Sequence, residues 1–65
     1  MKIEMTKCSD GVAEGHWDVD CESEQHAVVE RIMEINGVLE VSLYSEDGLA
    51  AGDNTRRGSW VAWTK

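Results

Sequence analysis

The segment from Ser23 to Gly37, SEQHAVVERIMEING, constrains the fold of this chain more than any other. Val28, Ile32 and Ile35 recur at i, i+4 and i+7, which is the spacing of one buried side of an α-helix. The pattern of the rest of the chain predicts strands and turns. The sequence therefore predicts one helix that covers the apolar side of a small sheet.

Local chemistry also predicts the ends of this helix. Ser23 can accept a hydrogen bond from the free amides of the first turn and so act as the N-cap. Asn36-Gly37 is expected to end the helix, because glycine readily adopts the left-handed backbone that closes a C-terminus. Val29 and Met33 widen the apolar stripe between these ends.

Four strands are predicted around the helix, at residues 1–8, 14–21, 38–44 and 59–64, from alternating apolar and polar side chains. The short turn at residues 9–11 makes the first two an antiparallel hairpin. The apolar sides of the first three strands are Met1, Ile3 and Met5; Trp17, Val19 and Cys21; and Leu39, Val41 and Leu43. The order ββαββ predicts an α+β fold, a small antiparallel sheet with one helix packed on one face, in a single domain of residues 1–65.

The net charge of −7 is unevenly placed along the chain. Residues 1–40 hold ten acids and three bases, whereas residues 41–65 hold three of each. Direct binding of nucleic acid is disfavoured, because phosphate contacts need lysine and arginine. A basic partner is favoured, including a protein that itself binds nucleic acid. A charge kept for solubility alone is the alternative.

Alternation places several carboxylates on the side of the sheet that faces away from the helix. The residues predicted to bind a partner are Glu4, Asp18, Asp20 and Glu40, with Glu30 and Glu34 on the solvent side of the helix. Like charges on ordered elements cost stability, which favours a use for them. The hypothesis is that they occupy the lysine and arginine pockets that a nucleic-acid-binding protein keeps for phosphates. The alternative is an ordinary solvated face.

Cys8, His16, Cys21 and His26 suggest a different function, that of a small metal- or thiol-dependent module. These ligand types suit zinc, but their spacing contains no CxxC or HxxxH pair. The run VERIMEINGVLEVSL resembles the helix-to-strand junction of heavy-metal-associated domains. Those domains carry a CxxC loop where this chain has one cysteine, so no metal and no cofactor are expected.

A long connection is predicted at residues 45–58, which is unusual in so small a domain. Its basic residues, Arg56 and Arg57, are expected to fold back on the domain's own carboxylates, and the alternative is that they bind an acidic group of a partner. The chain has three tryptophans and no phenylalanine, so at least one tryptophan should be in the core. In SWVAWT both faces of the strand are apolar, so a tryptophan should stay partly exposed as an interface anchor. A third function is therefore a structural subunit that pairs through a free sheet edge or its tryptophans, and we expect a monomer or weak dimer.

No catalytic motif occurs in the sequence. A chain of 65 residues has little room for a walled pocket beside its core, so an enzyme is not expected. No stretch is long enough to span a membrane, and the N-terminus has no apolar signal segment. The expected location is the cytoplasm.

In its size, in the charge carried by residues 1–40 and in its lack of a catalytic or metal motif, the chain resembles the small acidic anti-CRISPR proteins of phages, of the DNA-mimic kind. This resemblance implies a non-enzymatic inhibitor that acts in the cytoplasm of a bacterial host. It would bind a CRISPR effector subunit through the acidic face and block access to target DNA.

Overall fold

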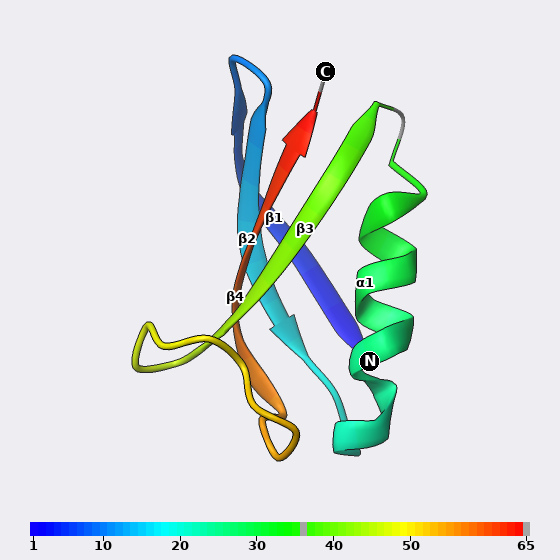
Figure 1. Ribbon diagram of the computed structural model, residues 1–65, viewed down its shortest axis with the longest axis vertical. Coiled ribbons are helices and arrows are strands. Elements are labelled where there is room, and N and C mark those ends of the chain that lie inside the picture. The colour runs from blue at the N-terminus through cyan, green and yellow to red at the C-terminus, as the bar shows by residue number, and fades with distance from the viewer. Residues whose placement is uncertain (36, 65) are drawn as a thin grey trace.

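The computed structural model describes residues 1–35 and 37–64 and shows a four-stranded antiparallel sheet with one α-helix (Figure 1). The elements are β1 (Lys2–Ser9), β2 (Val12–Asp18), η1 (Glu22–Glu24), α1 (Gln25–Met33), β3 (Val38–Ser45) and β4 (Arg57–Thr64). The predicted α+β class, with one helix and one antiparallel sheet, is confirmed. The 3₁₀ turn η1 precedes α1, so the order along the chain is β1–β2–η1–α1–β3–β4 rather than the plain ββαββ of the prediction.

The sheet has the strand order β1-β2-β4-β3. Since β4 pairs antiparallel with both β2 and β3, these two strands run in the same direction on either side of it. The turn of the β1–β2 hairpin is formed by Asp10 and Gly11, whose φ angles are 51° and 83°, as in a two-residue hairpin loop. The helix α1 lies on one side of the sheet and packs most closely on β3 (Figure 1).

The core confirms the predicted helix stripe. Val28 and Ile32 are buried, and Ile35 is half-buried against the same cluster. The sheet contributes the buried side chains of Ala13, Trp17, Val19, Trp60 and Ala62. Met33 is an exception, because it is 46% exposed near the end of α1 instead of widening the stripe.

Two β-bulges alter the predicted alternation in the edge strands. In β3 the register shifts between Val38 and Glu40. Leu39 therefore leaves the core and is 63% exposed, while Val38 packs against the core in its place. A second shift follows Met5 in β1. The prediction for Leu39 was wrong because a bulge resets which side chains share a face.

The inner side of β1 is only partly covered, because β1 is the edge strand furthest from β3, where α1 packs. Met5 keeps the inward register opposite Gly15 yet is 47% exposed, and Met1 is 53% exposed. Cys21 is also exposed, because β2 ends at Asp18 and the chain has already turned towards η1. Met1, Met5 and Cys21 were therefore wrongly expected to be buried.

The start of the helix also differs from the prediction. α1 begins at Gln25, and neither η1 nor α1 has a side-chain hydrogen bond at its N-cap. Ser23 lies inside η1, where its hydroxyl contacts the thiol of Cys21 at 3.1 Å, so it is not the N-cap. Gly37 has a φ of 88°, the left-handed backbone predicted for it. Asn36 lies outside the described residues.

Within residues 1–35 and 37–64, no helix is both long enough and apolar enough to cross a membrane.

Candidate functional site

The outer face of the sheet, defined as the face turned away from α1, carries side chains of both charges. Its charged residues are Glu4, Glu14, Asp18 and Glu40 with Lys2, Lys7 and Arg57. Three of the predicted partner-binding residues are thus on this face. The four acids and three bases give it a formal charge of only −1.

The strand register brings cations next to the predicted carboxylates. Lys2 Nζ lies 2.8 Å from Glu4 Oε1, and this hydrogen bond with its charge attraction lowers the pKa of Glu4 and raises the pKa of Lys2. Asp18 stands between Lys2 on β1 and Arg57 on β4 in the cross-strand register. The expectation of an acidic outer face is therefore corrected, because strand pairing brings bases from distant parts of the sequence onto it.

An open concavity of about 470 Å³ lies at one end of this face and is lined in part by Gly58. It contains the Lys2–Glu4 pair and a second ion pair, in which Arg57 Nε is 3.4 Å from Glu46 Oε1. His16 and Asp18 complete its charged and titratable lining. Both ion pairs are largely exposed, and pairs of that kind contribute little to stability.

The excess negative charge lies instead on the acidic layer, which we define as residues 20–34, comprising the turn after β2, η1 and α1. Its acids are Asp20, Glu22, Glu24, Glu30 and Glu34, and its single base is Arg31, which gives a formal charge of −4. Glu30 and Glu34 are both exposed and lie one helical turn apart, so they share a side of α1. The six predicted residues are therefore divided equally between the outer face and the acidic layer.

One of these five acids is neutralised by a base from another part of the chain. Glu22 Oε2 accepts a hydrogen bond from Arg56 Nε at 3.2 Å. The backbone N–H of Glu22 itself, and then Arg56, lower the pKa of this carboxyl. In the part of the chain that the structure describes, the other four acids of the layer form no ion pair. Their carboxylates are available to cations on a partner.

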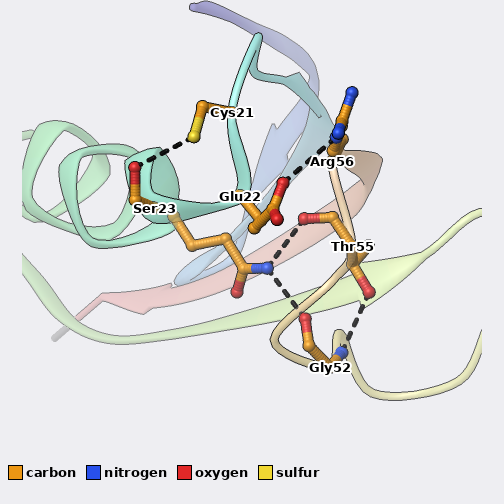
Figure 2. Close-up of polar contacts among 7 residues, drawn as sticks. Cys21, Glu22, Ser23, Gly52, Thr55 and Arg56 are labelled. Carbon is orange, nitrogen blue, oxygen red and sulfur yellow. Dashed lines mark hydrogen bonds and ion pairs between the residues drawn. The ribbon is translucent and has the colours of Figure 1, made fainter.

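The connection between β3 and β4, residues 46–56, is fastened to η1 and α1. Gln25 Nε2 donates to the carbonyl oxygens of Gly52 at 2.8 Å and Thr55 at 2.7 Å. The amide of Gly52 donates to Thr55 Oγ1 at 3.0 Å, and Arg56 reaches Glu22 (Figure 2). Sequence reasoning missed Gln25, because a polar residue in a first helical turn has no local sign of a contact 27 to 30 residues away.

Arg56, at the end of this connection, and Arg57, the first residue of β4, both fold back on the domain's own carboxylates, as predicted. Arg56 pairs with Glu22, and Arg57 pairs with Glu46. The tryptophan predictions are also confirmed, because Trp17 and Trp60 are 2% and 1% exposed, whereas Trp63 is 39% exposed on the outer face.

The four residues of the predicted metal- or thiol-dependent module do not form one site. Cys8 pairs with Ala13 and shares its inward side, whereas His16 lies on the outer face. Cys8 and Cys21 are free, exposed thiols, and His26 lies on α1. Among residues 1–35 and 37–64, no three His, Cys, Asp or Glu side chains are grouped so as to hold a metal ion. The sequence alone did not show that these four candidate ligands are kept apart. In the structure, the sheet separates them.

Comparison of the chain with protein-family models, curated proteins and solved structures found no match. The function proposed below therefore rests on the charge and geometry of the described residues.

Proposed function

We propose that this protein is a non-enzymatic binding protein that docks through its acidic layer on a basic, nucleic-acid-binding protein or complex. The observation that supports this is the separation of charge between the two sides of the fold. The acidic layer holds five acids and one base, whereas the outer face holds four acids and three bases. A polycation is therefore steered towards η1 and α1 rather than towards the sheet.

The mechanism that fits this layer is electrostatic mimicry of nucleic acid. Glu30 and Glu34 project from one side of a helix, with Cβ atoms about 5–6 Å apart. Asp20 and Glu24 add two further carboxylates near the start of α1. Carboxylates fixed on a turn and a helix can accept hydrogen bonds from lysine and arginine side chains that otherwise bind phosphates. Docking then blocks the partner's access to its nucleic acid.

A CRISPR effector subunit in a bacterial cytoplasm is one example of a basic, nucleic-acid-binding partner. It is the partner that the resemblance to anti-CRISPR proteins implies. The proposal assigns the main contacts to Asp20, Glu30 and Glu34. It gives Glu4, Asp18 and Glu40 a smaller share, because the outer face that carries them also holds three bases.

The test compares two double variants that change the net charge equally. Glu30→Lys/Glu34→Lys alters the acidic layer, and Glu14→Lys/Glu40→Lys alters the outer face. Each variant is used, beside the wild-type chain, to capture a partner and measure its affinity. We expect the first variant to lose binding and the second to retain most of it. Equal loss in both would show that net charge alone matters, and would contradict docking through α1.

A further inference from the structure

Along β4, the outer face carries a strip of uncharged side chains. A sheet face that contacts only water does not require such a strip. Its outward side chains are Ser59, Val61 and Trp63, and Val12 on β2 pairs with Trp63. Trp63 is 39% exposed, and Val12 and Val61 are half-buried. Solvated faces of antiparallel sheets usually alternate polar side chains with the buried set. An aromatic side chain within an uncharged strip, surrounded by charged residues of both signs, is the composition of a protein interface.

We propose that two copies of this chain form a dimer in which their outer faces pack against each other around Trp63. The dimer is symmetric about a twofold axis that runs parallel to the strands, between β2 and β4. This axis lays β2 of each copy over β4 of the other. Each outward residue of β2 then faces, in the second copy, the residue that is its own cross-strand partner on β4.

The strand register makes the outer face complementary to itself in this arrangement. Asp18 and Arg57 are opposite one another across β2 and β4, as are Val12 and Trp63. The twofold axis therefore places Asp18 over Arg57 of the second copy, and Val12 over Trp63 of the second copy. Two Asp18–Arg57 ion pairs therefore form between the copies at one end of the face, and two Val12–Trp63 apolar contacts form at the other end.

The distribution of charge favours a second copy of this chain as the partner that packs on the outer face. Two acidic layers, each with a formal charge of −4, repel each other, so this layer is not a self-association surface. The outer face attracts neither a polycation nor a polyanion strongly, since three bases stand among its four acids. A standard interface buries about 800 Å² per partner, which is less than a fifth of the chain's accessible surface of 4447 Å². The dimer does not depend on the proposed function, and it leaves both acidic layers outside.

The first test is the mass of the 65-residue chain measured by sedimentation equilibrium over a wide concentration range. The wild-type chain is expected to rise from its 7.2 kDa monomer mass to twice that value. Trp63→Lys is expected to stay monomeric with an unchanged circular dichroism spectrum. The control is Leu49→Lys, which places the same charge on a 67% exposed residue of the β3–β4 connection, and it should dimerise as the wild-type chain does. A wild-type mass of 7.2 kDa at all concentrations, or full dimerisation of Trp63→Lys, would overturn the proposal.

The second test examines the register with Asp18→Lys and Arg57→Glu. In a dimer of either variant, like charges face each other at both of the symmetry-related contacts between residues 18 and 57, so each variant alone is expected to be monomeric. In an equimolar mixture the introduced lysine of one chain faces the introduced glutamate of the other, and a heterodimer is expected. Failure of the mixture to dimerise, with both variants folded by circular dichroism, would contradict the placement of β2 over β4.

Discussion

The indole of Trp17 reaches across Gly58, its cross-strand partner on β4. Its N–H donates to the carbonyl oxygen of Ser59 at 3.0 Å and to that of Tyr44 at 3.2 Å. One buried side chain of β2 is therefore hydrogen-bonded to the backbone of both β4 and β3. The indole satisfies its polar atom inside the core, as buried donors must.

Trp60 repeats this arrangement in the opposite direction. It pairs with Gly15 on β2, and its N–H donates to Glu4 O at 3.1 Å and His16 O at 3.2 Å. The two tryptophans together link all four strands, while α1 covers them from one side. The sheet is thus held together by the indoles of Trp17 and Trp60, which lie over Gly58 and Gly15.

Both glycines are predicted to be required for this packing. A Cβ built on Gly58 lies 1.8 Å from Tyr44 O, and one built on Gly15 lies 1.8 Å from Glu4 O. Gly58→Ala and Gly15→Ala should each destabilise the fold by about 3 kcal/mol or more, because backbone must move. Gly52→Ala is the control, since a Cβ there meets nothing within 4 Å, and it should stay within about 0.5 kcal/mol of the wild type. Urea unfolding measures all three, and equal stabilities would refute the packing described.

The indole hydrogen bonds give a second prediction. Trp17→Phe keeps an aromatic ring in the core but removes the donor to Ser59 and Tyr44, and should cost about 2 kcal/mol. Trp63→Phe is the matched change on the outer face, where the side chain is 39% exposed, and should cost little. The comparison is made by thermal or urea unfolding at a concentration where the chain is monomeric. Similar losses for the two variants would speak against a special role of the Trp17 donor.

Gln25 is predicted to hold the β3–β4 connection in place. Gln25→Glu replaces the amide donor by a carboxylate that faces the carbonyl oxygens of Gly52 and Thr55, which accept from Gln25 at 2.8 and 2.7 Å. We expect faster amide exchange throughout residues 52–56 and a loss of about 1 kcal/mol in the free energy of unfolding. Gln25→Ala, which removes the donor without adding charge, should show a smaller effect. Unchanged exchange in both variants would mean that the connection is held by other contacts.

Acid should weaken the same connection. The pKa of Glu22 is lowered in the folded protein by its own backbone N–H and then by Arg56. A carboxyl whose pKa is lower in the folded state contributes stability above its unfolded pKa and loses it as the pH falls through the folded pKa. Stability should therefore fall as the pH is lowered below the ordinary glutamate range. Glu22→Gln should be less stable than the wild type at neutral pH and less sensitive to acid, and a pH profile parallel to that of the wild type would refute the prediction.

The features that could be predicted from the sequence are those encoded over a few residues. Val28, Ile32 and Ile35 share a side of α1 because their spacing matches the helical period, and they are the helix residues that reach the core. The alternation that buries Trp17 and Val19 is equally local. Leu39 could not be predicted, because a bulge depends on the partner strand and leaves no mark in the alternation itself.

The candidate site was harder to predict because it depends on contacts between distant residues. The charged residues nearest to Asp18 in the sequence are the acids Glu14 and Asp20, yet the register places it between Lys2 and Arg57. Gln25 reaches a turn of the β3–β4 connection, which no local pattern encodes. The sign of the charge on residues 1–40 followed from composition, but its division between the outer face and the acidic layer required the fold.

Docking on a basic protein through the acidic layer is tested most directly by capture with competition. The wild-type chain and Glu30→Lys/Glu34→Lys are immobilised side by side, incubated with a bacterial lysate, and washed with rising salt or with added DNA or RNA. We expect the wild-type chain to recover a nucleic-acid-binding protein or complex that moderate salt and competing nucleic acid both release, and the variant to recover none. Equal recovery by the two chains, or a captured partner that nucleic acid does not displace, would contradict electrostatic mimicry by this layer.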